Sequence, residues 1–290
     1  MSHRVRTAVL PAAGFGTRML PETLAVPKEL LPVGGKPAIQ WALDEASDAG
    51  IDRFIIVSSR LKPAIETYLL GQFEATVPVH ASNWLGRADS RSTHIEVVYQ
   101  PVARGLGDAV RVARSAVGNE PFIVLLPDEI LLGGSRLLRV MIDDFEHTGR
   151  SGVSLLRVPQ EEISAYGCAE IAPGRCGDER LLVTGCIEKP RSGAAPSCFA
   201  LSGRYVLGPE LFDLLDGVEP DARGEVQLTQ ALHRAAASTP LAGFVVRETD
   251  GRTDIGNWEG WLDANIRAFS SNELHDFEVT TEDSRLHRTR

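Results

Sequence analysis

Residues 7–21 read TAVLPAAGFGTRMLP, a short apolar run followed by a turn that contains two glycines. The run Thr7–Pro11 has the small and branched apolar side chains of a buried strand. Gly14 and Gly16 let the backbone turn sharply after that strand, and no Cβ there keeps a ligand away from the chain. Successive N–H groups in such a loop can face phosphate oxygens. The ordinary alternative is a tight strand-to-helix turn without a ligand.

The chain on either side of this loop alternates between strand and helix patterns. Further strands are expected at residues 54–57, 95–99 and 122–126, and helices at residues 36–49, 63–73 and 107–117. Strands that alternate with helices form βαβ units. The first half therefore predicts an α/β fold, a three-layer αβα sandwich with a mainly parallel, Rossmann-like sheet. Ligands on such sheets bind beyond the carboxyl ends of the strands.

The pattern changes near residue 150, where shorter strand candidates alternate with turn-rich segments. These strands are expected at residues 153–158, 181–187 and 200–206, with a turn at residues 173–178 and a polar stretch at residues 82–94. No linker or repeat separates the two halves. We therefore expect one domain over residues 1–269, with a first half (1–150), an elaborated second half (151–269) and a polar tail (270–290).

Composition excludes several classes of protein. The 290 residues include 39 acidic and 30 basic side chains, a net charge of −9, which argues against attraction to nucleic acid or to anionic membranes. No apolar run is long enough to span a membrane, and the first residues lack the pattern of a signal peptide. The four cysteines have no CxxC spacing, which disfavours a disulfide framework or a zinc site and favours a reducing cytoplasm.

Two basic residues stand close to the glycine loop. Arg18 lies in the loop itself, and Lys28 lies in the segment PKELLP at residues 27–32. The loop does not fit the dinucleotide fingerprint GxGxxG, because Leu20 occupies the position of the last glycine, and no Gly-Lys-Ser/Thr of a P-loop follows. A nicotinamide oxidoreductase is therefore disfavoured. The ordinary alternative for the two cations is a solvated basic pair.

The motif GxGTRxxP with a downstream PKELLP is similar to the signature of the nucleoside triphosphate:sugar-1-phosphate nucleotidyltransferases. Nearly the whole chain shares this resemblance, and several blocks in the same order resemble the bacterial uridylyltransferases that join UTP and glucose-1-phosphate. These blocks are QPVARGLGDA at residues 100–109, LLPD at 125–128, EKP at 188–190, GRYVL at 203–207, GEVQLT at 224–229 and DIGN at 254–257.

The resemblance implies a reaction that joins two polyanions. A sugar phosphate oxygen attacks the α-phosphorus of the nucleotide, and pyrophosphate leaves without a covalent enzyme intermediate. Arg18 is then expected to hold the leaving pyrophosphate, and Lys28 to neutralise the transferred α-phosphate.

The resemblance also implies that Asp128 and Asp254 together hold Mg²⁺, which prefers carboxylate and phosphate oxygens. An ionised Asp128 after an apolar strand is costly without a compensating cation or hydrogen bonds. Asp254 alone also fits an ordinary turn.

Further site residues follow from the same resemblance. For the nucleotide they are Ala13, Gly14, Gly16, Thr17, Gln100 and Gly105, and for the sugar phosphate they are Gly167, Glu188, Lys189 and Glu225. The ordinary alternative for residues 188–190 is a strand end with exposed charges. The resemblance further implies a homo-oligomer, either a dimer or a tetramer.

Three departures from the uridylyltransferase pattern leave the specificity open. Leu24 replaces a lysine common in the glucose enzymes, and residues 168–170 and 257–261 differ from the usual sequence. The alternatives are therefore a paralogue that uses dTTP or GTP, or one that uses another sugar or cyclitol phosphate. A non-catalytic nucleotide-sugar sensor is a further alternative, although such a protein usually loses the cationic and acidic residues that this chain keeps.

Overall fold

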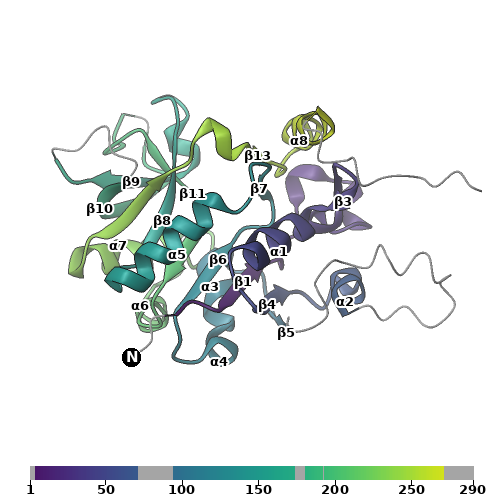
Figure 1. The fold of residues 1–290 in the computed structure, drawn as a ribbon, viewed down its shortest axis with the longest axis horizontal. Helices are drawn as coiled ribbons and strands as arrows, with labels where there is room; N and C mark the ends of the chain where they lie inside the picture. The colour runs from purple at the N-terminus through teal and green to yellow at the C-terminus, as the bar shows by residue number, and fades with distance from the viewer. Residues whose placement is uncertain (1–3, 71–93, 174–179, 192, 271–290) are drawn as a thin grey trace, which may run out of the picture.

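A computed structural model describes residues 4–70, 94–173, 180–191 and 193–270. A nine-stranded sheet forms its centre. The strands are β1 (Thr7–Pro11), β4 (Arg53–Ser58), β5 (His94–Tyr99), β6 (Phe122–Leu125), β8 (Gly152–Arg157), β9 (Gly167–Ile171), β10 (Arg180–Glu188), β11 (Phe199–Leu207) and β12 (Leu241–Val245). Their order across the sheet is β5-β4-β1-β6-β11-β8-β12-β10-β9 (Figure 1).

Helices cover both faces of this sheet because successive strand residues point to opposite sides. Ala8 and Leu10 face one hydrophobic core, and Val9 between them faces the other. The first core includes residues of α1 (Ala38–Asp48), α2 (Pro63–Leu70) and α5 (Arg136–Thr148). The second includes residues of α3 (Gly105–Val112), α4 (Arg114–Val117), α6 (Leu211–Asp216) and α7 (Leu228–Ser238). The predicted αβα sandwich is confirmed.

The two halves of the sheet differ in strand direction. Strands β4, β1 and β6 run parallel, and so does the edge strand β5, as the βαβ pattern predicts. Strand β11 is antiparallel to both β6 and β8, and β10 is antiparallel to β12 and β9. Because β9 also pairs with β11, the last strands curl back toward the middle of the sheet. The second half is therefore a mixed sheet.

Several predicted boundaries shift in the structure. Helix α1 begins at Ala38 because residues 36–37 form strand β3 (Lys36–Pro37), which pairs with β2 (Pro32–Val33). The expected helix at residues 107–117 divides into α3 and α4 where the N–H of Ala113 bonds to the carbonyl of Val110, three residues back. Strands β9 and β12 lie outside the runs that the sequence pattern predicts. Most of the polar stretch 82–94, nearly all of the turn 173–178 and the tail beyond residue 270 lie outside the described residues.

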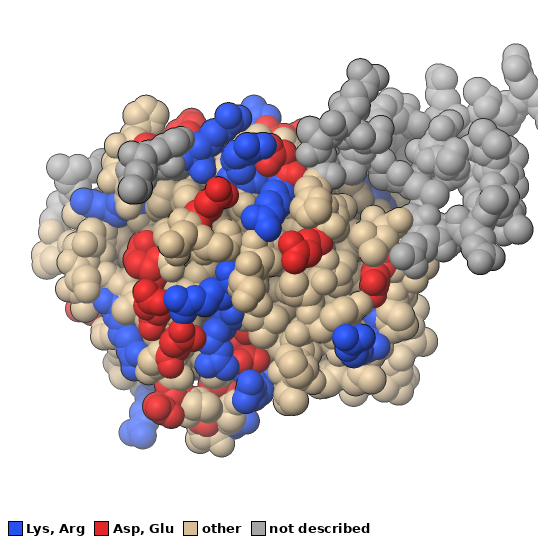
Figure 2. Space-filling model, turned by 90° about the horizontal axis from the view of Figure 1, so that it is seen from below, with Lys and Arg blue, Asp and Glu red and all other residues tan. Residues whose placement is uncertain are grey.

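A two-stranded ladder and the last helix lie beside the main sheet. Strand β7 (Glu129–Leu131) pairs with β13 (Arg252–Asp254), and α8 (Trp258–Ser270) follows β13 directly (Figure 1). Of the helices in the described part of the chain, none is long and apolar enough to cross a membrane. On the face shown in Figure 2, Lys and Arg side chains are interspersed with Asp and Glu side chains.

Candidate active site

The loops after the parallel strands meet at one edge of the sheet. The N–H of Ala12, after β1, donates to the carbonyl of Val57 at 2.7 Å. The N–H of Gln100, after β5, donates to the carbonyl of Ser58 at 2.9 Å. Each loop is thus fixed to its neighbour, and this is the edge at which α/β sheets bind ligands. Ala13, Gly14 and Gln100 accordingly share the carboxyl edge of the sheet.

The glycine loop contains two different glycines: Gly16 has a backbone conformation that favours glycine, and Gly14 is open to solvent. Gly16 has a φ of 65° and precedes a short 3-10 helix that begins at Thr17. A Cβ on Gly16 would also lie 3.2 Å from the Cγ2 of Thr23, so another residue would strain the loop. A Cβ on Gly14 would meet no heavy atom within 4 Å. The backbone at Gly14 is therefore accessible to a ligand.

Arg18 extends from this loop to the turn after β13. A Cβ on Gly256 would lie 2.7 Å from the Nη2 of Arg18 and 2.9 Å from the Oδ1 of Asp254. The N–H of Gly256 donates to that carboxylate at 2.7 Å. The guanidinium of Arg18 therefore lies beside a fixed carboxylate, and its side chain is exposed to solvent.

Lys28 and Asp128 form an ion pair across the site. The Nζ of Lys28 donates to the Oδ2 of Asp128 at 2.5 Å. Burial alone would lower the pKa of Lys28, but Asp128 and Glu29 outweigh it and the pKa is raised. Burial alone would raise the pKa of Asp128, but Lys28 outweighs it and that pKa is lowered. Both groups are therefore held in their charged forms.

The β7–β13 ladder brings the two predicted metal carboxylates close together. Glu129, the residue after Asp128, is paired in register with Asp254. The N–H of Ile255 donates to the carbonyl of Asp128 at 2.9 Å. Burial raises the pKa of Asp254, and the negative charges of Glu129 and Asp128 raise it further, against the hydrogen bond from Gly256. Among the described residues no group of three or more His, Cys, Asp or Glu side chains is arranged to hold a metal ion. Carboxylate oxygens are ligands that Mg²⁺ prefers, and it commonly takes one or two of them together with substrate phosphates, so the pair Asp128 and Asp254 fits a divalent metal.

An ion pair between Arg252 and Glu129 joins the two strands of the β7–β13 ladder. The Nε of Arg252 and the hydroxyl of Ser202 both donate to the Oε2 of Glu129 at 2.7 Å. The guanidinium of Arg252 also lies 3.5 Å from the Oδ2 of Asp254. Glu129 therefore serves as an anchor for the strand that carries Asp128.

Gln100 and Gly105 occupy a tightly packed corner. The amide of Gln100 donates to the Oδ2 of Asp108 at 2.8 Å and to the carbonyl of Gly105 at 3.3 Å. Gly105 has a φ of 88°, and a Cβ there would lie 2.8 Å from the carbonyl oxygen of Val226. The loop after β5 thus rests on the segment that contains Glu225.

Arg18, Lys28, Asp128 and Asp254 form a first cluster. A second cluster, around Glu188, lies where β9 and β10 curl back over the sheet. The hydroxyl of Thr229 donates to the Oε2 of Glu188 at 2.6 Å. A Cβ on Gly167 would lie 3.1 Å from that hydroxyl and 3.3 Å from that carboxylate oxygen. Lys189 has a left-handed φ of 44°, and its Nζ lies 3.5 Å from the Oε1 of Glu188. Such backbone strain in a non-glycine residue often marks a functional site.

A pocket of about 260 Å³ opens beside this second cluster. Its lining is mostly charged or amide side chains, namely Glu188, Lys189, Asp221, Arg223, Gln227 and Gln230. Glu225 also approaches it, because the amide of Gln227 donates to its Oε2 at 2.9 Å. The two clusters flank the buried phenol of Tyr205, whose pKa is raised by burial and further by carboxylates of both, including Glu188 and Asp128.

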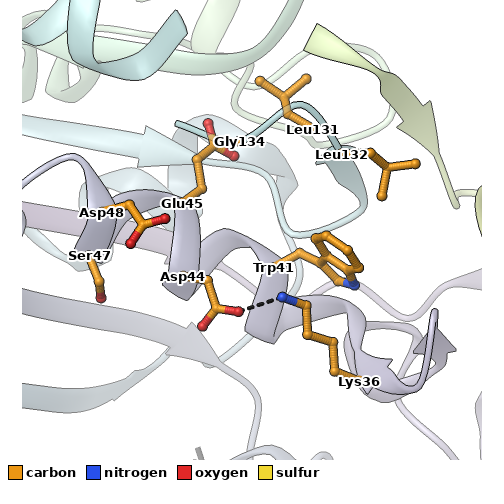
Figure 3. A pocket seen from close by; sticks show the side chains of 9 residues that line it. All are labelled: Lys36, Trp41, Asp44, Glu45, Ser47, Asp48, Leu131, Leu132 and Gly134. Atoms are coloured by element: carbon orange, nitrogen blue, oxygen red, sulfur yellow. Dashed lines mark hydrogen bonds and ion pairs between the residues drawn. The ribbon is translucent and has the colours of Figure 1, made fainter. Parts of the chain in front are cut away.

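Another pocket, of about 330 Å³, is lined by residues of α1, by Lys36 and by residues 131, 132 and 134, and includes none of the predicted site residues (Figure 3). The Nζ of Lys36 points across it to the Oδ2 of Asp44 at 2.5 Å and lies 3.8 Å from the ring centre of Trp41. Lys36 is thus paired with Asp44 inside the pocket, and Glu45, which also lines it, is paired with the buried Arg204.

The sequence patterns do not identify four polar residues that support the site. Three of them contact a predicted site residue: Asp108 contacts Gln100, Thr229 contacts Glu188 and Arg252 contacts Asp254. The fourth, Lys62, joins two segments beside the first cluster. Asp108 and Thr229 lie inside blocks of the resemblance, so those blocks mark them. Lys62 follows the carboxyl end of a predicted parallel strand. That position is the one sequence feature that indicates that Lys62 lies near the ligand site.

The fold and the two clusters define a class of protein, an α/β protein with a polar ligand site at the carboxyl edge of a Rossmann-like sheet. The chain belongs to the Nucleotidyl transferase family, because the sequence model of that family matches residues 7–270. It is 37% identical over 272 residues to a UTP–glucose-1-phosphate uridylyltransferase of Staphylococcus epidermidis, with 91% of this chain and 92% of the relative covered. A Streptococcus pyogenes protein of the same name is also 37% identical, over 91% and 88% of the two chains.

Solved structures give the same result. A crystal structure of UDP-glucose pyrophosphorylase complexed with UDP-glucose superposes with a TM-score of 0.82 at 30% identity, covering 92% of this chain and 99% of that one. A UTP-bound UGPase from Acinetobacter baumannii superposes with a TM-score of 0.81 at 31% identity, covering 93% and 95%. These relatives extend over both halves of the fold.

Proposed function

We propose that this protein transfers a uridylyl group from UTP to glucose-1-phosphate, giving UDP-glucose and pyrophosphate. One observation carries the proposal: Lys28, Arg18 and the carboxylates Asp128 and Asp254 meet at the carboxyl edge of a sheet of this family. Two cations beside two carboxylates suit a reaction that aligns polyanions around a divalent metal. The relatives named for UTP and glucose-1-phosphate support the choice of substrates.

Lys28 and Arg18 act on the nucleotide phosphates. The Nζ of Lys28, which is charged and mostly enclosed, neutralises the α-phosphate as negative charge shifts toward the leaving group. The exposed guanidinium of Arg18 holds the β- and γ-phosphates, for which its planar fork is well shaped. The Lys28–Asp128 ion pair must open or widen when a phosphate enters, so substrate binding exchanges one anionic partner for another.

Asp128 and Asp254 would hold Mg²⁺. The metal, when bound, supplies Lewis-acid neutralisation of the phosphates. Burial, together with the negative charges of Glu129 and Asp128, raises the pKa of Asp254, and a divalent cation bound there would relieve this cost of the charged form. Arg252 and Glu129 keep the two ligand strands in register.

The remaining predicted residues divide between the two clusters. Ala13, Gly14, Gly16 and Thr17 form the loop that would approach the nucleotide, and Gln100 with Gly105 would contact the base. Gly167 would pass close to the sugar ring, while Glu188, Lys189 and Glu225 would bind its hydroxyls and phosphate. The pocket of about 260 Å³ beside Glu188 and Lys189 supports this division.

A second candidate is transfer from dTTP or GTP, or to another sugar or cyclitol phosphate. The observation that favours it is Leu24, which is 81% exposed in the loop beside the phosphate-binding residues, where the glucose enzymes commonly carry a lysine. A non-catalytic sensor is disfavoured because the chain keeps the full set of cations and carboxylates.

The test is a pyrophosphate-release assay with Mg²⁺ that crosses UTP, dTTP, GTP, CTP and ATP with glucose-1-phosphate and a panel of other sugar phosphates. The proposal predicts fastest release with UTP and glucose-1-phosphate. Faster release with another pair would establish the second candidate. No release with any pair, from protein that unfolds cooperatively, would favour the sensor.

A further inference from the structure

Lys62 connects two separate segments beside the first cluster, the glycine loop and the turn that carries Lys28, through a single buried ammonium group. Its Nζ donates to the carbonyl of Ala12 at 3.0 Å and to the two carboxylate oxygens of Glu29 at 3.1 and 2.9 Å. Lys62 is 7% exposed and Glu29 is 1% exposed. Lys62 itself lies in the loop after β4, the strand next to β1 in the sheet.

The partners of Lys62 adjoin residues that the proposed function uses. Ala12 directly precedes Ala13 and Gly14, which lead into the glycine loop, and Glu29 directly follows Lys28. One ammonium therefore bridges the backbone that approaches the nucleotide and the turn that carries the cation for its α-phosphate.

Stability alone gives a poor reason for such a pair. Burial lowers the pKa of Lys62 and raises that of Glu29, so both groups lose solvation in their charged forms. A buried ion pair commonly stabilises a fold no more than well-packed apolar side chains of similar volume. It does, however, define the separation of the elements it joins, because an ammonium has three donors and here three acceptors.

We propose that Lys62 is a positioning residue for nucleotidyl transfer, which fixes the distance between the glycine loop and Lys28. This inference rests on the proposed function for its kinetic consequence. Neither the carbonyl of Ala12 nor the carboxylate of Glu29 touches the reacting atoms in this scheme. Instead, this carbonyl and this carboxylate bind the Lys62 ammonium group, and the two segments that contact the nucleotide are thereby held in position.

The test uses Lys62→Met, which keeps the length of the side chain and removes all three donors. Misplacement of reacting groups by about 1 Å can cost roughly 10²-fold in rate. We expect kcat to fall by roughly that factor and the KM for UTP to rise, while the KM for the sugar phosphate is unchanged. A merely structural role would reduce only the fraction of active enzyme, which lowers kcat and leaves both KM values unchanged.

Three further variants complete the kinetic test. Glu29→Gln removes the charge but keeps an acceptor, so it should give a smaller effect in the same direction. Combined with Lys62→Met it should add little, because both act through one contact. Lys36→Met removes a lysine from the ion pair with Asp44, which lines the pocket of about 330 Å³ without any predicted site residue, and should leave all kinetic constants unchanged.

Hydrogen exchange gives a measurement that does not depend on activity. In Lys62→Met the amides of residues 12–18 and 28–31 should exchange faster than in the wild-type protein, while those of α5 are unchanged. Unchanged exchange in both segments, or unchanged UTP kinetics in folded Lys62→Met and Glu29→Gln, would overturn the inference. If the wild-type protein transfers no nucleotide, the proposed function fails, and the exchange experiment still decides whether Lys62 orders the two segments.

Discussion

Replacing Lys28 with methionine separates the electrostatic role of this lysine from its bulk. The Nζ of Lys28 lies 2.5 Å from the Oδ2 of Asp128, and the two side chains are 18% and 20% exposed. Breaking a fully buried pair costs roughly 3–5 kcal/mol. Because about a fifth of each side chain here reaches solvent, we expect a loss of about 2 kcal/mol in the free energy of unfolding. For a chain of this size that lowers Tm by about 4–8 °C.

The same variant should respond more strongly to metal. Without Lys28, Asp128 loses its ion-pair partner, while Arg18 and Arg252 remain beside Asp254. Bound Mg²⁺ would then supply the compensation that Asp128 has lost. Saturation at about 100 times Kd contributes about 2.7 kcal/mol, which is more than the loss of about 2 kcal/mol. Calorimetry with and without Mg²⁺ measures this, and kcat should also fall by about 10²–10³-fold. Equal Tm values, an equal response to Mg²⁺, or an effect confined to KM would refute the reasoning.

The other predictions concern the carboxylates and the turn beside Arg18. Asp128→Asn should abolish Mg²⁺-dependent turnover and leave the circular dichroism spectrum unchanged; near-normal turnover would remove Asp128 from the metal site. The pKa of Asp128 is lowered in the folded protein, so its contribution to stability is complete above the unfolded value of about 3.9 and is lost as the pH falls through the folded pKa. Urea unfolding should therefore show a loss of stability below about pH 4 that Asp128→Asn lacks. Gly256→Ala places a Cβ 2.7 Å from the guanidinium of Arg18 and should raise the KM for the nucleotide, whereas unchanged kinetics would show that Arg18 moves without consequence.

The first half of the fold could be predicted because its signals are local. The apolar run at Thr7–Pro11, the glycines after it and the alternating helices all lie within short windows, and the parallel half of the sheet follows from them. Strands β9 and β12 could not be predicted in this way, because β9 is stabilised by pairing with both β10 and β11. Such long-range pairing leaves little trace in a short window of sequence.

The candidate site also contains residues that are neighbours in the sequence and residues that only the fold brings together. Arg18 and Lys28 stand beside the glycine loop in the sequence, so their closeness could be argued from the residues. Asp128 and Asp254 meet only through the β7–β13 ladder, and that pairing was implied by the family resemblance alone. Lys62 has no motif of its own, and its role emerges only from the oxygens that surround its ammonium group.

The most direct measurement of the central claim is the stoichiometry of products from UTP and glucose-1-phosphate. With Mg²⁺ present, the wild-type protein should form UDP-glucose and pyrophosphate in equal amounts, chelation of the metal should stop both, and Asp128→Asn should form neither. Release of pyrophosphate without a nucleotide sugar, or equal product formation by Asp128→Asn, would contradict the account.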